Sequence, residues 1–547
     1  MALVQEVIAD SEQLFSKRST FMSYLQELAE QFYPERADFT FQRYLGDEFM
    51  TNLTTSYPVI ACRELGNTLS SMLRPKSDQW FRMSVNRPER LDQAGKQWLE
   101  WATATQRRAM YDRPAMFARA TKEGDRDYAA FGQCVISVDL NPAGNGFLYR
   151  CWHLRDVAWR ENAVGEIDTI YRRWKACARD LAMLFPGKLH QSVEKAAKDE
   201  PYREFSCLHA MVPADSRVVT KKVRQRFVSL YIDCENAHVM EEAGRHVKGY
   251  VIPRWQTVSG SQYAHSPAAV AALPDARLIQ AVTLTLLEAG EMAAGPPMLA
   301  VQEAIRGDVD LRSRGITWVD AEYDERLGEV LRPVTQNNSG LPFGLEVHDR
   351  AREMIAEAFF LNKLTLPPAT GRDMTAYEVS QRVQEFIRTT LPLFEPIEED
   401  YNGALCEETF NLGYHAGLFG PVAQTLPPSL SGLDIQWQFQ SPLSEAADRK
   451  KGAQYMETAN LLAVASQVDP NAAMILDAKT ALRDALEGIG TPAKWLVGEE
   501  QVAAMEQAMR QSQAMAATVQ GVGGVAEVAE QAGNAIQSLQ AAGLVAA

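Results

Sequence analysis

The sequence has 547 residues, of which 55 are Lys or Arg and 70 are Asp or Glu, so its formal net charge is −15. Its content of 46% hydrophobic and 23% charged residues excludes a disordered chain, and its length predicts roughly two to four compact units. The acid excess excludes a protein that wraps DNA by neutralising phosphates, but permits one that encloses DNA without holding it tightly.

The seven cysteines are scattered and include no C-x-x-C pair, which argues against a disulfide framework and a thiolate zinc site. The first ten residues lack the positive charge of a signal peptide. The most apolar stretch, 278–287, is interrupted by Gln280, Thr283 and Thr285 and is too short to span a bilayer. We therefore expect a soluble chain that folds in a reducing cytoplasm without a membrane partner.

The first third of the chain predicts helices followed by strands. Apolar residues recur at helical spacing, and prolines end two of the runs. The predicted helices cover about 14–32, 57–73, 98–110 and 116–131. Two strands at 134–139 and 147–152 are predicted to follow, joined by an Asn- and Gly-rich turn.

Strands are predicted to dominate residues 156–254. In 223–232 both alternating sets of side chains are partly apolar, which is typical of a strand covered on both faces. A basic cluster lies beside it, formed by Lys221, Lys222, Arg224 and Arg226. A nucleic-acid surface is one interpretation, but a solvated sheet edge is the favoured one.

The centre of the chain alternates helical and irregular patterns. A helix over 274–290 precedes strands and turns in 298–336, and a second helix follows over about 345–361. A loop at 362–373 contains two prolines and a glycine. A long helical pattern then extends to 409, and Pro392 and Pro396 within it predict a kink, because the periodicity resumes beyond them.

Thr375 and Glu378 have the spacing of a capping box, which predicts a well-defined start for this long helix. Farther on, Ser441, Asp469 and Thr491 each precede a proline and predict further helix starts. Beyond 499 the chain is rich in Ala, Gln, Met and Gly, which fits either a fraying helix or a segment ordered only by neighbours.

Signatures of catalysis are absent from the sequence. It has no phosphate-binding G-x-x-x-x-G-K-[ST] loop, no G-x-S-x-G elbow and no H-E-x-x-H helix. Cys234 and His238 form a lone pair, for which ordinary packing is the favoured interpretation. The best enzymatic candidate is a magnesium-dependent nuclease that uses the carboxylates Asp308, Asp310, Glu322 and Asp324. Such carboxylates are expected on any turn-rich surface, so we expect no enzyme and no cofactor.

The order helix, strand-rich insertion, helix, short loop and long kinked helix resembles the portal proteins, or head-to-tail connectors, of short-tailed bacteriophages. Three strings are also similar to that family: Arg63-Glu-Leu-Gly-Asn-Thr-Leu-Ser-Ser-Met-Leu-Arg-Pro75, Arg254-Trp255 with Gly260-Ser-Gln-Tyr-Ala-His-Ser-Pro267, and Met374-Thr-Ala-Tyr-Glu-Val379. Ala264 departs from the family pattern, which has glycine there.

The resemblance implies an α+β, mainly α, portal fold with a wing, a two-helix stem, a clip, a channel loop and a helical crown. Its segments are a wing at 1–265, a first stem helix at 266–295, a clip at 296–342, a second stem helix at 343–361, a channel loop at 362–372, a long kinked wing helix at 373–425, a crown at 426–498 and a C-terminal barrel or flexible tail at 499–547.

The resemblance further implies a non-enzymatic ring, typically a homododecamer, at one capsid vertex of the virion, assembled in the host cytoplasm. Implied partners are double-stranded DNA in the channel, the terminase large subunit, scaffold and major capsid proteins, and tail adaptors. The implied channel-loop residues are Asn362, Lys363, Thr365 and Arg372, and the clip residues implied in partner contacts are Arg306, Arg312 and Arg314. The nuclease and another head-tail adaptor ring remain the alternatives, although adaptors are generally shorter.

Overall fold

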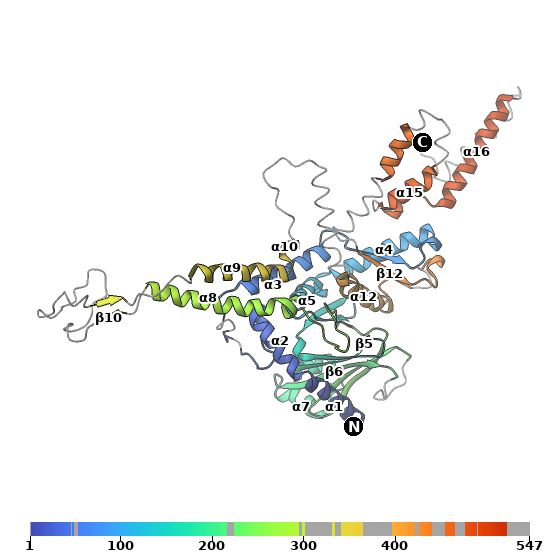
Figure 1. Ribbon diagram of the computed structural model, residues 1–547. Helices are drawn as coiled ribbons and strands as arrows, with labels where there is room; N and C mark the ends of the chain where they lie inside the picture. Colours follow the sequence, from blue (N-terminus) through green and yellow to red (C-terminus); the bar gives the residue numbers. More distant parts are fainter. Residues whose placement is uncertain are drawn as a thin grey trace. The chain divides into compact units, whose positions relative to one another are not determined.

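The structure is a computed structural model of the whole chain (Figure 1). It describes residues 2–44, 46–48, 53–215, 224–294, 298–300, 331–333, 341–364, 396–421, 426–439, 454–464, 476–488 and 491–521. The chain divides into a larger unit, 1–81 with 105–420 and 439–443, and a smaller unit, 82–104 with 421–438 and 444–547.

Helices form the N-terminal part of the larger unit, as the sequence predicts. They are α1 (Ala2–Lys17), α2 (Ser19–Phe32), α3 (Tyr57–Leu73) and α5 (Phe117–Phe131). Pro34 follows α2, and α3 ends before Arg74 and Pro75, since proline cannot continue a helix. The predicted helix over 98–110 begins earlier, as α4 (Gln93–Met110), which contributes residues to both units.

A five-stranded antiparallel sheet occupies the strand-rich region, in the order β4-β5-β6-β7-β8. Its strands are β4 (Val157–Glu161), β5 (Ile167–Cys177), β6 (Glu204–Pro213), β7 (Phe227–Asp233) and β8 (His238–Arg245). Nearly every residue of β7 is buried, which confirms a strand covered on both faces. Arg224 and Arg226 are exposed, and Arg226 pairs with Glu166 at 3.2 Å, so these charges are solvated. They precede β7, which is an inner strand, and so do not form the predicted sheet edge.

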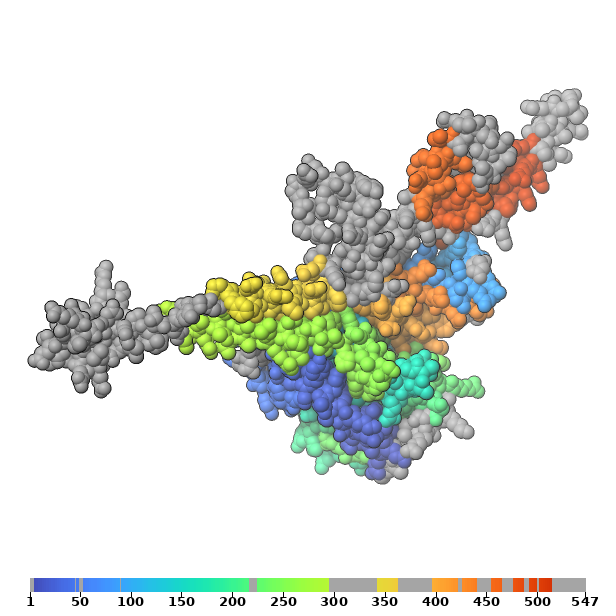
Figure 2. All heavy atoms as spheres, viewed as in Figure 1, coloured from blue at the N-terminus to red at the C-terminus, as the bar shows by residue number. Residues whose placement is uncertain are grey.

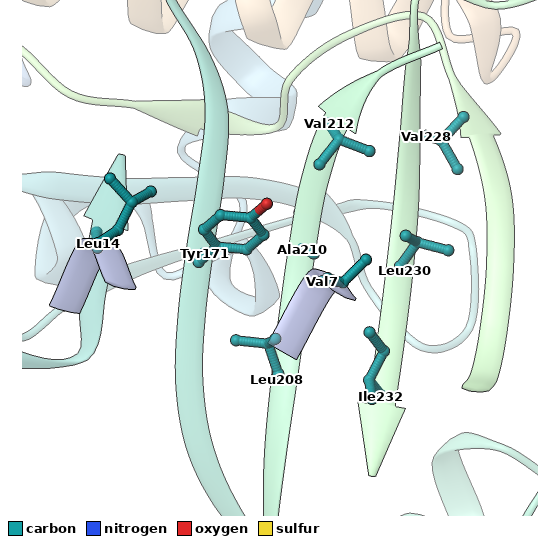
Figure 3. Close-up of a cluster of buried hydrophobic side chains, with 10 residues drawn as sticks. Val7, Leu14, Tyr171, Leu208, Ala210, Val212, Val228, Leu230 and Ile232 are labelled. Atoms are coloured by element: carbon teal, nitrogen blue, oxygen red, sulfur yellow. The ribbon is translucent and has the colours of Figure 1, made fainter. Parts of the chain in front are cut away.

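Helix α1 covers one face of this sheet. Figure 3 shows Val7 and Leu14 beside residues of β5, β6 and β7, among them Tyr171 and Leu230. Two short helices, α6 (Ala178–Leu184) and α7 (Gln191–Asp199), bury apolar residues against Phe205 and Met240. The sequence analysis predicted strands here and missed both helices, because seven and nine residues give too few turns for a readable period.

A three-stranded sheet, β3-β2-β9, lies between α5 and the later helices. The predicted hairpin is observed as β2 (Val135–Leu140) and β3 (Phe147–Trp152), and β9 (Tyr250–Val251) pairs with β2 on its other side. Gly132 ends α5 with φ +74, and a Cβ there would lie 2.5 Å from the carbonyl carbon of His265. Only glycine fits at this position.

A buried ion pair lies at the centre of the larger unit. The Arg74 guanidinium contacts the carboxylate of Asp125, donates to Asn402 Oδ1 (2.5 Å), and lies 4.6 Å from the Tyr401 ring centroid. Both charged side chains are almost completely buried. Burial raises the pKa of Asp125, and the Arg74 charge opposes that rise. This cluster joins α3, α5 and the helical segment around 401.

The C-terminal half of the predicted long helix is observed in part. Residues 398–403 form a π-helical segment (Glu398–Gly403) directly after Pro396, and α12 (Ala404–His415) continues it. π-Helical turns and prolines both distort helices, so this segment agrees with the predicted kink. Pro392 and the capping pair Thr375 and Glu378 lie outside the described residues.

The smaller unit contains the two-stranded sheet of β1 (Phe81–Val85) and β12 (Ile435–Phe439), most of whose residues belong to it. Its later helices are α15 (Ala478–Gly488) and α16 (Glu499–Gly521), so the Ala-rich tail is helical as far as 521. Gln93 donates to the Leu496 carbonyl (3.0 Å), and Glu100 accepts from the Ala493 N–H (2.7 Å). These bonds fix residues 493–496 along α4.

Candidate functional site: the α8–α9 hairpin

Two long helices of the larger unit run side by side and form a hairpin (Figure 1). Helix α8 (Leu273–Ala294) follows a π-helical segment at Ala268–Ala272, and α9 (Leu341–Ala358) returns along it. A Cβ at Gly344 would lie 3.0 Å from Leu286 Cδ2, so glycine allows close packing of the two helices. Helix α9 starts four residues before its predicted start, with Pro342 at its second position, where proline is tolerated.

The half of the hairpin nearer to α2 and α3, here called the proximal half, is part of the core. Leu273, Ala276 and Ile279 of α8 are buried, as are Ala351 and Ile355 of α9. This half packs onto α2, α3 and α5, since Phe32 and Phe359 lie edge to face at 5.4 Å. The proximal half is therefore fixed to the helical core.

The other half, here called the distal half, comprises residues 281–294 of α8 and 342–350 of α9. None of these described residues is fully buried. Large apolar side chains are exposed on both helices: Leu284, Leu287 and Met292 on α8, and Phe343 and Leu345 on α9. Phe343 is 70% and Leu287 55% exposed. Figure 2 shows α8 and α9 side by side at the surface. A group of exposed large apolar side chains of this kind marks an interaction site.

Residues 268–294 are also long and apolar enough, by length and composition, to cross a membrane. The sequence analysis judged only 278–287 and found that stretch too short. One such helix is weak evidence for a span, because core helices of soluble proteins pass the same test. One face of its proximal half is buried in protein, and Gln280 bonds to protein backbone.

Both hairpin helices are anchored at the start of α3. Gln280 of α8 bonds to the backbone of Thr54 and Thr55, and the Arg352 guanidinium of α9 lies 4.7 Å from the Tyr57 ring centroid. An exposed ion pair also ties α8 to α2, since Arg277 Nε donates to Glu27 Oε1 (2.7 Å).

The segment that precedes α8 docks on the end of α5. The Trp255 N–H donates to the Gly132 carbonyl (2.7 Å), the Ala264 N–H donates to Gln133 Oε1 (3.0 Å), and Ser266 Oγ donates to the Ala130 carbonyl (2.7 Å). Ala264 is 1% exposed. This is the string that resembles the portal family, and its role in the fold is to fix the base of α8.

The chain changes direction where α9 ends. Phe360 has φ +59, a conformation that costs a bulky residue about 1–3 kcal/mol. Its ring stacks on Trp255 at 6.3 Å, and Phe359 beside it is fully buried. A short helix, α10 (Leu361–Leu364), follows this turn.

The predicted site residues are mostly outside the described part of the chain. Asn362 and Lys363 were predicted to lie in a loop, which is wrong, because both lie in α10. Leu361 and Leu364 are three positions apart, as on one face of a helix, and this signal of α10 was not used. The remaining predicted site residues lie outside the described residues: Thr365, Arg372, Thr375, Glu378, Arg306, Arg312 and Arg314. So do the candidate nuclease carboxylates Asp308, Asp310, Glu322 and Asp324.

Within the clip segment the structure describes two short strands, β10 (Met298–Ala300) and β11 (Leu331–Pro333), which pair antiparallel. Among all described residues, no group of three His, Cys, Asp or Glu side chains is placed to hold a metal ion. The exposed apolar surface of the hairpin was not predicted from the sequence. The apolar residues at 284, 287, 343 and 345 could have indicated it.

Glu408 of α12 is a half-buried carboxylate beside β9. Its side chain accepts the Gly249 N–H (3.0 Å). Burial raises the pKa of Glu408 to about 7, and the negative charge of Glu407 adds to the rise, whereas the Gly249 N–H and Lys248 oppose it. Because the folded state binds this proton more tightly than the unfolded state, its contribution to stability is present below about pH 4.5 and is lost as pH rises through 7.

Glu408→Gln is therefore expected to stabilise the chain at pH 8 by about 1–3 kcal/mol, because glutamine keeps the acceptor without the buried charge. The gain is expected to vanish near pH 5. Urea unfolding of both chains between pH 5 and 8 measures it. A gain that is equal at both pH values would contradict the assignment of the charge, and Glu194→Gln, on an exposed side chain of α7, is the control.

Comparison with known proteins adds family information. The family model described as "Bacteriophage head to tail connecting protein" matches residues 4–497. A "Probable portal protein" of Bordetella phage BPP-1 is 24% identical over 79% of this chain and 78% of its own length. The "Portal protein" of Salmonella phage epsilon15 is 21% identical over 94% and 93%.

Among solved structures, a chain of the "Virion of native gene transfer agent (GTA) particle" is 9% identical, with a TM-score of 0.36 over 79% of this chain and 94% of that one. A chain of the "Neck of empty GTA particle computed with C6 symmetry" is 12% identical, with a TM-score of 0.35 over 77% and 93%.

Proposed function

The chain belongs to the family of bacteriophage head to tail connecting proteins, and on this premise we propose that it is the subunit of a portal ring through which DNA enters and leaves a phage capsid. The observation that carries the proposal is the apolar distal half of the α8–α9 hairpin, which has no cover among the described residues of its own chain. Such a surface requires a partner.

A second copy of the chain is the partner that fits this surface. Phe343 and Leu345 of α9 and Leu284 and Leu287 of α8 give the hairpin an apolar surface on each helix. When one face of a subunit binds a different face of the next, the contacts form a ring if the rotation between copies closes. The hairpins of successive copies then form the stem around a central channel, and the resemblance implies about twelve copies.

The segment assignment of the resemblance is retained as part of the proposal. The wing, stem, clip, crown and C-terminal tail keep the boundaries given above, and the proposed channel loop is shortened to 365–372, because Asn362 and Lys363 lie in α10. The clip arginines Arg306, Arg312 and Arg314 are proposed to contact the terminase large subunit during packaging and tail adaptors afterwards. Scaffold and major capsid proteins are the proposed partners in shell assembly. The ring is proposed to lie at one capsid vertex of the virion, where it is assembled in the host cytoplasm.

The protein is proposed to have no catalytic activity of its own. The sequence has no phosphate-binding loop, so ATP hydrolysis during packaging belongs to the terminase. The acid excess of the chain repels phosphates, which keeps contacts with moving DNA weak. Any cleavage of DNA that needs magnesium and is lost in Asp308→Ala would contradict this part of the proposal.

The role as a DNA conduit can be tested in cells that produce the phage, by measuring the nuclease-protected DNA in their shells. Without this chain, they are expected to assemble shells that contain no nuclease-protected DNA, and the chain supplied in trans is expected to restore it. Filled shells in the absence of the chain would contradict the proposal.

Lys363 and Arg372 are proposed to face the channel, where a ring repeats each positive charge once per copy. Replacing both by alanine is expected to leave rings intact and to lower nuclease-protected DNA per capsid several-fold, because weak phosphate contacts that centre the DNA are lost. Arg224→Ala with Arg226→Ala, at the exposed entrance to β7, is the control. Equal DNA content in both variants would exclude these side chains from the channel.

A further inference from the structure

Gln280 is a half-buried polar side chain of α8, and such a group is costly unless it is bonded. Its Oε1 accepts from the Thr54 N–H (2.8 Å) and the Thr55 N–H (3.0 Å), and its Nε2 donates to the Thr55 carbonyl (2.9 Å). The Thr54 hydroxyl lies 2.8 Å from both the carbonyl oxygen and Oε1 of Gln280. One side chain thus holds two successive peptide units that are 225 and 226 positions away in sequence.

The second hairpin helix holds the adjoining residue. Arg352 of α9 places its guanidinium over the ring of Tyr57, the first residue of α3. The bonds of Gln280 and the contact of Arg352 together form a clasp, defined here as Gln280 and Arg352 with Thr54, Thr55 and Tyr57. Each hairpin helix is thereby tied to the start of α3.

The clasp lies at the boundary between the two halves of the hairpin. Ile279 is fully buried, and beyond it no residue of α8 is. In α9 the buried residues begin at Ala351, next to Arg352. The clasp is therefore the last fixed point before the exposed distal half. It holds the angle at which that half projects from the helical core.

We propose that the Gln280 clasp sets the tilt of the distal hairpin and thereby the number of copies that close the ring. The inference rests on the proposed function and adds a determinant of ring size to it. Successive copies are rotated by about 30° in a ring of twelve and by about 28° in a ring of thirteen. A change of about 2° in the rotation between adjacent copies therefore separates neighbouring ring sizes, and the tilt of the hairpins that pack against each other in the proposed ring bears on that rotation. A bonded clasp restricts the angle, whereas apolar contacts between hairpins tolerate such a shift.

Gln280→Met tests the proposal, because methionine keeps the length of the side chain and removes every bond of its amide. Native mass spectrometry of the purified full-length chain gives the distribution of ring sizes. We expect a single dominant mass for the natural chain and, for the variant, a several-fold rise in the share of rings with one copy more or fewer. Thr68→Val is the matched control, since it also removes a threonine hydroxyl, but one that bonds within its own helix α3, to the Glu64 carbonyl (2.8 Å), and lies outside the distal half.

Thr54→Val is the milder second variant, which loses the hydroxyl contacts with Gln280 but keeps the backbone bonds, and it decides the matter if Gln280→Met does not fold. Rings of unaltered size distribution in every folded clasp variant would overturn the inference while leaving the ring itself established. A natural chain that forms no ring would instead overturn the proposed function, and this inference with it.

Discussion

Leu284→Asp combined with Leu287→Asp is expected to convert the ring into a folded monomer. Leu284 and Leu287 are exposed in the single chain, so the substitutions leave its core intact. In the proposed ring both side chains are buried between copies, where an unpaired carboxylate costs several kcal/mol. A loss of about 6 kcal/mol per interface lowers the affinity by more than 10⁴-fold.

Sedimentation velocity measures the change, and far-UV circular dichroism checks that the fold is kept. The matched control is Val164→Asp, which introduces the same charge at a side chain 84% exposed in the turn between β4 and β5. The control is expected to form rings. If the doubly substituted chain still forms rings at the concentration at which the natural chain does, the hairpin does not lie in the interface.

Asp125→Asn is expected to lower the free energy of unfolding by about 3–5 kcal/mol, because it leaves the Arg74 charge buried without a counter-ion. Urea unfolding of the monomeric double-aspartate chain measures this without a contribution from assembly. Asp125→Leu combined with Arg74→Met is expected to recover much of the loss, since apolar replacement of a buried pair is often neutral.

The exposed ion pair between Lys188 and Glu241 provides the control for this measurement. Glu241→Gln is expected to change the free energy of unfolding by less than about 1 kcal/mol, because solvent screens exposed charges. Equal losses in Asp125→Asn and Glu241→Gln would contradict the assignment of the Arg74–Asp125 pair to a dry core.

Sequence patterns predicted the helices and sheets well where the signal was local. Pro34 and Pro75 stopped two helices, and the Asn- and Gly-rich turn at 141–146 joined β2 to β3 as expected. The α+β, mainly α fold and the family were both confirmed. Helices α6 and α7 were missed because their apolar residues are too few to show a period beside long strands.

Contacts between distant parts of the chain could not be predicted. Arg74 reaches Asp125 and Asn402, which are 51 and 328 positions away, and no spacing rule relates them. Gln280 looked like an interruption of an apolar run because its partners lie 225 positions upstream. Nor does periodicity separate a leucine that faces the core of its own chain, such as Leu273, from one that is exposed in the single chain, such as Leu287.

The native mass of the purified chain, with negative-stain images of the same sample, tests the ring most directly. The account predicts a particle of roughly twelve 60.9 kDa chains, about 730 kDa, seen end-on as a ring with a central hole. A chain that stays monomeric or dimeric at every concentration, with no rings in the images, would contradict it.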